Sequence, residues 1–180
     1  MEAHFDDAYL VKRAQEGYLD AYAELVQRHS ARAYRVALRL LRDHHDAQDV
    51  AQESLVVAWQ QLPRFRGDAT FTTWLYRIVT RRCLNHIHRA KATASRDALD
   101  DVSDDSADPA TALERDLTLD AVTHAIAALP PAQRVVIVLH HLEGLSYLEV
   151  ARATGSSEPS VRSHLFRARR TLGKSLDEWR

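Results

Sequence analysis

An arginine-rich segment near the C-terminus carries the residues with the clearest chemistry in this chain. In a helix, Arg162, Arg167 and Arg170 share one face with Ser163 and Phe166. Guanidinium groups pair with guanine edges and phosphates in the major groove, so this face suits DNA. The opposite face is apolar and is expected to be buried; it contains Val161, Leu165, Ala168 and Leu172. The alternative is an ordinary helical hairpin whose arginines only face solvent.

A helix-turn-helix is the element expected to position this face. The stretch 146–149 (S-Y-L-E) matches a capping box, which predicts a short helix that ends near Thr154. Gly155 permits the positive φ of a tight turn. One of the serines at 156–157 is expected to cap the second helix, and Pro159 suits its first turn, where no N–H is required.

A polar stripe forms a second candidate binding surface. Asp49, Gln52 and Glu53 stand at positions i, i+3 and i+4 of a predicted helix and therefore share a face. No Lys or Arg stands nearby in the sequence to neutralise the two carboxylates. The stripe predicts either a plain solvated face or a docking surface for a basic partner, because unpaired acids accelerate association with cationic surfaces.

Charge is segregated along the chain, although the formal net charge is only −1. One basic segment has no acidic residue within it and contains Arg77, Arg81, Arg82, Arg89 and Lys91. The arginine-rich helix is the second basic segment, and an acidic stretch at 97–108 lies between the two. Segment 93–112 is rich in Asp, Ser, Ala and Thr, which predicts a flexible acidic linker.

The expected fold is all-α, with two small helical domains. The 180 residues allow one or two domains, and a hydrophobic fraction of 46% is enough for real cores. Apolar residues recur at helical spacing in 7–16, 20–43, 46–62 and 71–88, with a continuation or a break near Ser30. We therefore expect a four-helix N-terminal domain over 1–92, the linker over 93–112, and a C-terminal helix-turn-helix domain over 113–180.

Other chemistries have less support in the sequence. The apolar runs are too short to cross a bilayer, and the lone Cys83 fits a reducing cytoplasm. No phosphate-binding loop or nucleophile elbow predicts an enzyme, so we expect no catalytic residue and no cofactor. Cys83, His86 and His88 leave a metal or redox site open as an alternative. No second Cys completes a common ligand set, so we expect no metal.

Several stretches, in order, resemble the signatures of bacterial extracytoplasmic-function (ECF) sigma factors. The string D-A-Q-D-V-A-Q-E at 46–53 resembles that family's D-A-x-D-x-x-Q-E motif. Residues 65–78 (F-R-G-D, then F and T-W-L-Y-R-I) resemble its promoter-melting segment. Residues 144–147 and 161–169 resemble its C-terminal helix-turn-helix. Together these stretches cover most of the chain outside the expected linker.

The resemblance implies an alternative sigma factor in the cytoplasm, which directs promoter-specific transcription initiation. Its implied partners are promoter DNA, an anti-sigma factor that holds it inactive, and core RNA polymerase, through the clamp helices of the largest subunit and the flap. The implied polymerase-binding residues are Asp46, Asp49, Gln52 and Glu53. A stand-alone helix-turn-helix regulator is the alternative, but such a protein has no use for this polar stripe.

The resemblance also implies two DNA-binding regions. A pocket formed by the loop 66–72 and the following helix captures a flipped base of the minus-ten element. The implied minus-ten residues are Arg66, Phe71, Trp74, Arg77, Arg81, Arg82 and Asn85. For Trp74, spacing favours the core over base stacking. Many members carry Asn where this chain has Arg81. The implied minus-thirty-five residues are Ser160, Arg162, Ser163, Phe166, Arg167 and Arg170.

Overall fold

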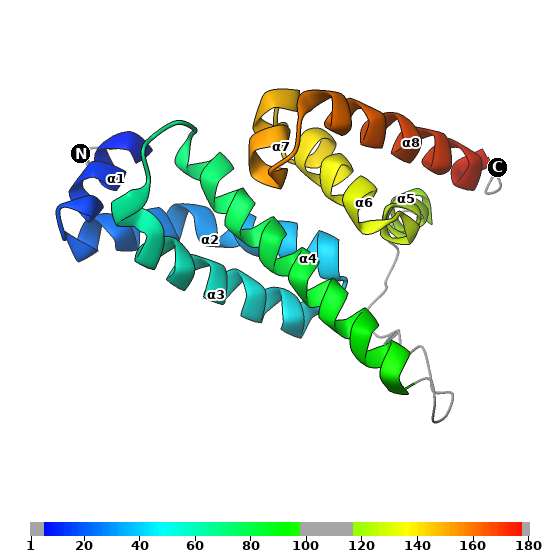
Figure 1. Cartoon of the computed structure of the whole chain (residues 1–180), viewed down its shortest axis with the longest axis horizontal. Helices are drawn as coiled ribbons and strands as arrows, with labels where there is room; N and C mark the ends of the chain where they lie inside the picture. The colour runs from blue at the N-terminus through cyan, green and yellow to red at the C-terminus, as the bar shows by residue number, and fades with distance from the viewer. Residues whose placement is uncertain (1–5, 98–116, 178–180) are drawn as a thin grey trace.

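The structure, a computed structural model, describes residues 6–97 and 117–177, and these ranges contain helices and no strand (Figure 1). The all-α prediction is confirmed. Most of the predicted linker lies outside the described residues. None of the described helices is both long and apolar enough to span a membrane.

The first group of helices contains α1 (Asp7–Gln15), α2 (Leu19–Leu41), α3 (His44–Gln61), the 3-10 turn η1 (Leu62–Arg64) and α4 (Phe71–Asp97). Side-chain caps fix two of the starts, because Asp6 accepts from the Tyr9 amide and Asp43 accepts from the Asp46 amide, both at 2.7 Å. Arg42 ends α2 in the left-handed conformation, with φ of 66°. The core between these helices includes Leu25, Val36, Leu40, Leu75 and Val79.

The second group contains α5 (Leu117–Ala128), α6 (Pro131–Ile137), the π-helical turn η2 (Val138–Leu142), α7 (Tyr147–Thr154) and α8 (Glu158–Asp177). The helix-turn-helix prediction is confirmed in detail. Ser146 and Glu149 form the capping box of α7, and Gly155 takes a φ of 66° in the turn. Ser157 accepts from the Ser160 amide at 3.4 Å, so it caps α8.

Two helices differ from their predicted extent. Helix α2 runs through Ser30 without a break. Helix α4 was expected to end near His88, but it continues to Asp97 and takes in the first residues of the predicted linker. The extension is rich in Ala, Arg and Lys, which favour helix, and it contains no Gly or Pro to end it.

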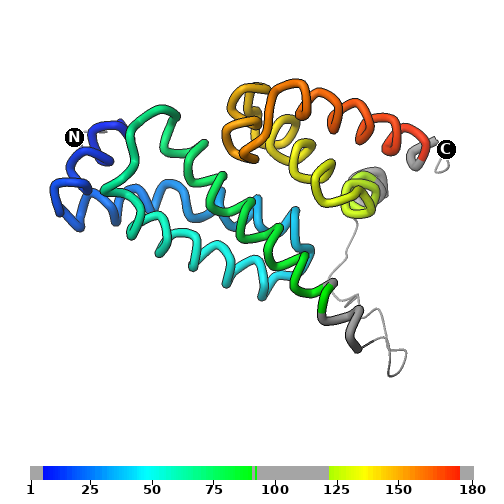
Figure 2. Tube along the Cα trace, in the orientation of Figure 1, coloured from blue at the N-terminus to red at the C-terminus, as the bar shows by residue number. Residues whose placement is uncertain are grey.

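The two groups of helices lie side by side, with α7 against the first half of α4 (Figure 2). Buried apolar side chains form one continuous cluster that extends from the first group into the second.

We expect Ser146→Ala to lower the free energy of unfolding by about 1 kcal/mol, because the change removes the cap of α7. Urea denaturation followed by circular dichroism measures the change. Ser30→Ala in the interior of α2 is the control and should leave stability unchanged or slightly higher, since Ala favours helix. Equal stability of Ser146→Ala and the unaltered chain would contradict the role of this cap.

Candidate nucleic-acid interface

The loop before α4 and the first turns of that helix surround an open cavity of about 400 Å³. Its lining combines aromatic and cationic side chains: Arg64, Phe65, Arg66, Asp68, Ala69, Thr73, Trp74, Arg77 and Arg152. The rings of Trp74 and Phe65 pack with centroids 4.8 Å apart. An aromatic wall beside several guanidinium groups can hold an unstacked base and the phosphates on either side of it.

A second cavity, of about 340 Å³, shares Trp74 and Arg77 with the first and continues along α4 toward α3. It is lined by Val57, Gln61, Trp74, Arg77, Ile78, Arg81, Arg82 and Asn85. All the predicted minus-ten residues except Phe71 line one or both cavities. The two cavities share lining residues, so the residues that were chosen from the sequence lie along one cationic strip of α4 and the loop before it. Trp74 itself is half-buried, so it contributes to the packing and to the cavity wall.

Phe71 is the exception, because only 4% of it is exposed. Its ring packs 5.1 Å from that of His29 and 5.8 Å from that of Trp74. A side chain enclosed in this way cannot stack on a base unless the loop moves. Phe71 instead packs in the core and lines a separate cavity on the other side of the loop, so a DNA contact at Phe71 stays a prediction.

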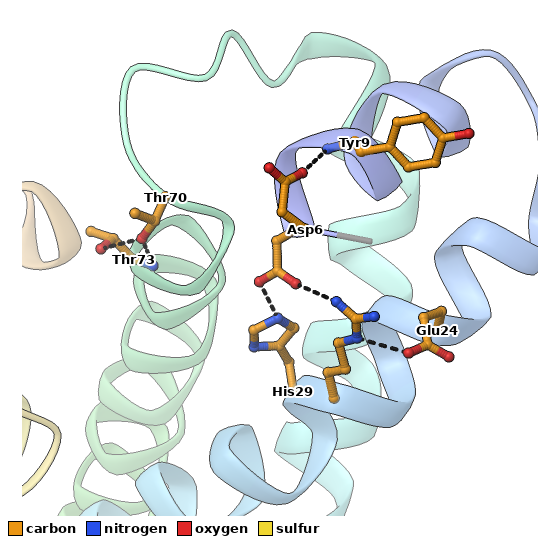
Figure 3. Close-up of polar contacts among 8 residues, drawn as sticks. Asp6, Tyr9, Glu24, His29, Thr70 and Thr73 are labelled. Carbon is orange, nitrogen blue, oxygen red and sulfur yellow. Dashed lines mark hydrogen bonds and ion pairs between the residues drawn. The ribbon is translucent and has the colours of Figure 1, made fainter. Parts of the chain in front are cut away.

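A polar network joins α1 and α2 close to the start of α4. His29 lies 2.7 Å from the carboxylate of Asp7, and Arg28 joins Asp7 to Glu24. Figure 3 shows His29 and Glu24 on α2 facing the start of α1, with Thr70 and Thr73 at the start of α4 nearby. The hydroxyls of Thr70 and Thr73 lie 2.9 Å apart, and Thr70 also accepts from the Thr73 amide. The network joins α1 to α2, and the ring of His29 also packs against Phe71 at the start of α4.

The polar stripe on α3 is exposed, as predicted for Asp49, Gln52 and Glu53. Its carboxylates are nevertheless not isolated. Arg82 of α4 forms an ion pair with Glu53. No Lys or Arg stands near this stripe in the sequence, but α4 packs against α3 and brings Arg82 alongside it.

Two histidines complete the pairing on this stripe. His86 of α4 lies 2.9 Å from Asp46, and His45 lies 3.2 Å from Asp49 within α3. All these groups are at least partly exposed, so water and salt screen their attraction and each pair contributes little to stability. The stripe therefore remains available to a partner that carries stronger or better-placed cations.

The arginine-rich face of α8 is exposed, and its apolar face is buried as predicted. Phe166 is a large apolar side chain that projects into solvent from this face. Arg162 lies 3.5 Å from Glu158 and over the ring of Tyr147, which restricts where its guanidinium can reach. Ser163, Arg167 and Arg170 lie on the same side of the helix. The geometry is that of a recognition helix with an open face.

Sequence reasoning missed residues that border this face. His141, at the end of η2, accepts from Arg169 at 3.2 and 3.3 Å. Burial, then the neighbouring His140 and Arg169, lower the pKa of His141, so its ring is neutral and can accept. Because the partners stand in different helices, no local pattern could have shown this contact.

The first cavity, at the start of α4, also contains residues that were not selected. Phe65 and Arg64 directly precede the selected Arg66, and Phe65 stands in the stretch 65–78 whose resemblance offered a signal for it. Arg152 belongs to α7, and nothing in the sequence relates it to the loop before α4. Only the packing of the two groups of helices brings it there.

Cys83 is fully buried, and burial raises the pKa of its thiol to about 12. Among the described residues, no group of three or more His, Cys, Asp or Glu side chains is placed to hold a metal ion. His86, which neighbours Cys83 in sequence, is engaged with Asp46 on the surface. The metal or redox alternative thus finds no converging ligands in the described part of the chain.

Comparison with known proteins shows similarity along the whole chain. The family model of Sigma-70 region 2 matches residues 25–93, and that of Sigma-70 region 4 matches residues 119–172. The RNA polymerase sigma-H factor of Pseudomonas aeruginosa is 34% identical over 94% of this chain and 93% of its own length. The ECF RNA polymerase sigma factor SigM of Mycobacterium tuberculosis H37Rv is 34% identical over 94% of this chain and 84% of its own.

Solved structures agree with these relatives. CnrH, in complex with the cytosolic domain of CnrY, is 29% identical and superposes with a TM-score of 0.72 over 96% of this chain and 97% of that one. The sigma factor RpoE of Bartonella quintana, in complex with the anti-sigma factor NepR, shares the fold at 22% identity, with a TM-score of 0.71 over 87% of this chain and 96% of that one.

We expect Cys83 in the native protein to resist alkylation by iodoacetamide at pH 8, because its thiol is enclosed and protonated. Mass spectrometry before and after denaturation measures the labelling, and one thiol should react only once the chain is unfolded. The control is Val56→Cys, a position exposed on α3, which should be alkylated in the native state. Rapid native labelling at Cys83 would contradict its burial.

Proposed function

The chain belongs to the ECF sigma factors, and from that premise we propose how its residues divide the work of starting transcription. As a member of this family it is an alternative sigma factor, which binds core RNA polymerase and directs it to promoters. We assign residues 1–92 to polymerase docking and the minus-ten element, and residues 113–180 to the minus-thirty-five element. Segment 93–112 links them, although α4 occupies its first residues.

The exposed stripe on α3 is the docking surface in this proposal. Asp49, Gln52 and Glu53 are exposed and Asp46 is half-buried beside α4. The clamp helices of the largest polymerase subunit are the proposed partner of these four residues. In the free chain Arg82 forms a weak, exposed ion pair with Glu53, and His86 and His45 lie beside Asp46 and Asp49. A polymerase cation that binds Glu53 would compete with Arg82. Arg82 would then be free to contact a DNA phosphate.

The linked cavities along α4 are the proposed minus-ten site, and their gathered cations are the observation that carries the proposal. A flipped base costs a few kcal/mol of lost stacking. The Trp74 and Phe65 rings can offset this cost by stacking, and Arg66 and Arg77 can hold the adjoining phosphates. Arg81 replaces the Asn of many members with a longer cationic side chain. We therefore expect a minus-ten preference of its own for this chain.

The open face of α8 is the proposed minus-thirty-five reader. Arg167 and Arg170 are placed to reach base edges, while the engaged Arg162 is better placed for a phosphate. Ser160, Ser163 and the exposed Phe166 complete the surface, and Phe166 suits a thymine methyl group.

We also propose a regulatory partner and a compartment. CnrH was solved with the cytosolic domain of a second protein, and by analogy an anti-sigma factor binds this chain in the cytoplasm, where polymerase and DNA are found. Run-off transcription with purified core polymerase on a library of genomic fragments tests the whole proposal. Discrete transcripts that require this chain support it, and the absence of any such transcript would overturn it.

Charge reversal of the docking stripe gives a sharper test. Asp49→Lys combined with Glu53→Lys should reduce binding to core polymerase at least tenfold, because cations replace the acids that attract the clamp helices. Biolayer interferometry with immobilised core enzyme measures the affinity. Glu16→Lys, at an exposed acid outside the stripe, is the matched control and should bind normally. Normal binding by the double variant would refute the docking role.

Removal of one arginine side chain from α8 tests whether this helix contacts bases. We expect Arg167→Ala to weaken binding to the minus-thirty-five sequence by about 1–3 kcal/mol, because a bidentate contact to a base is lost. Fluorescence anisotropy with the promoter duplex and with scrambled duplex measures the change. An equal loss on both duplexes would mean that Arg167 contacts only phosphate.

A further inference from the structure

Two arginines of α8 are joined by a row of aromatic rings that belongs to the elements beside this helix. Arg162 lies over the ring of Tyr147, 5.6 Å from its centroid. The ring of Tyr147 packs against that of His140 with centroids 4.7 Å apart, and His140 packs against His141 at 4.8 Å. The Nε2 atom of His141 accepts from Arg169 at 3.2 and 3.3 Å. The row therefore begins and ends on guanidinium groups of the same helix.

Both ends of this row stand at one edge of the open face of α8. Arg162 and Arg169 are seven positions apart in the sequence, which is about two helical turns, so they lie on the same side of the helix. Helical spacing places this side between the buried stripe of Val161 and Leu165 and the exposed Arg170. The rings belong to η2 and α7, and α6 and α7 pack against α8 (Figure 1).

The contact with His141 does not use all the donors of Arg169. A guanidinium carries five N–H donors, and His141 engages the Nε hydrogen and one Nη2 hydrogen. The Nη1 group and the second Nη2 hydrogen lie on the outer edge of the guanidinium. This outer pair has the fork geometry that holds two oxygens of a phosphate. Arg169 is exposed, so a phosphate can reach it.

The edge of a recognition helix is where DNA phosphates are expected. Phosphates border the major groove on both sides, so a helix in the groove has base edges before its central face and phosphates beside its edges. In helix-turn-helix proteins the first helix of the motif crosses the DNA backbone. Here that helix is α7, which begins with Tyr147 of the ring row. The row is thus placed beside the backbone strand that α7 would cross.

We propose that Arg169 holds a DNA phosphate at the edge of the minus-thirty-five element, and that His141 is the positioning residue that aims its guanidinium. Tyr147 and His140 support His141 from behind and restrain Arg162 at the other end of the row. The inference rests on the proposed role of α8 and adds a contact that carries no sequence information. A long side chain that is fixed before binding loses less conformational freedom when it meets its ligand.

The tautomer of His141 is a spectroscopic signature of this geometry. Because both donors of Arg169 point to Nε2, that nitrogen must be bare and the ring proton must lie on Nδ1. Long-range 1H–15N spectra of the full chain at pH 7.5 identify the tautomer, and the signal that is missing from His141→Gln assigns it. We expect the Nδ1–H form in the unaltered chain and a shift away from it in Arg169→Leu. A proton on Nε2 in the unaltered chain would overturn the positioning contact.

Binding of the full chain to duplex DNA tests the phosphate contact. We expect Arg169→Ala to weaken binding about tenfold, and equally on the promoter duplex and a scrambled duplex, because a charge-assisted contact to phosphate is lost. The slope of log affinity against log salt should fall in magnitude by about 0.9, the contribution of one phosphate. Fluorescence anisotropy over a series of salt concentrations measures both quantities. Arg13→Ala, which removes one cation from the first group of helices, is the matched control and should change neither.

Variants of His141 separate positioning from packing. His141→Phe keeps a ring but has no acceptor, so it should weaken binding severalfold on both duplexes. His141→Gln, whose side-chain oxygen can accept, should restore most of the affinity. In the Arg169→Ala background His141→Phe should have no effect, because His141 acts through Arg169. A loss that persists in that background would mean that His141 only supports the fold, and the positioning role would be refuted.

The outcomes keep this inference separate from the proposed function. Unchanged affinity and salt slope in Arg169→Ala would overturn the phosphate contact, whatever Arg167→Ala shows. A loss restricted to the promoter duplex would make Arg169 a base contact and would overturn its assignment to phosphate. A chain that binds both duplexes equally would refute the proposed minus-thirty-five reader. Both duplexes carry phosphates, so the loss at Arg169 would still be measured in that case.

Discussion

Helix α4 is the constraint on which the other features of this molecule depend, because it is divided into three faces along its length. Phe71, Leu75 and Val79 pack into the first group of helices. Thr73, Tyr76 and Thr80 meet the second group. The remaining face is a narrow strip with Trp74, Arg77, Arg81 and Asn85. The width of the nucleic-acid surface is thus fixed by what the other two faces bury.

The same division explains how a nearly neutral chain can bind nucleic acid. The positive groups are concentrated on one face of α4 and one face of α8, while α3 presents carboxylates. Fields of opposite sign on separate surfaces attract different partners, which net charge alone does not reveal. Where α3 and α4 meet, Arg82 and Glu53 join the two surfaces through one ion pair. The occupancy of one surface can therefore affect the other.

Buried side chains are mostly apolar within each group of helices, whereas several buried side chains are polar where the two groups meet. Within each group, residues such as Leu25, Val79 and Leu165 are closely enclosed and apolar. Between the groups, the buried hydroxyls and Glu143 find their partners across the contact, and Arg134 of α6 donates to the Leu40 carbonyl at the end of α2 at 2.7 Å. Polar contacts of this kind fix the orientation of the two groups, while the apolar cluster that continues across the same contact supplies the buried area.

The sequence by itself determined the local features of this protein. Apolar periodicity predicted the helices, and the S-Y-L-E box with Gly155 predicted the helix-turn-helix. The motifs identified the family. Of the residues that the resemblance selected for the minus-ten element, all except Phe71 line the two cavities along α4. Only the tertiary structure decided that Glu53 has a cationic neighbour and that Arg152 reaches the cavity. The physical reason is range. Caps and periodicity depend on residues within a few turns, whereas ion pairs and shared cavities depend on side chains that only the packing of distant helices brings together.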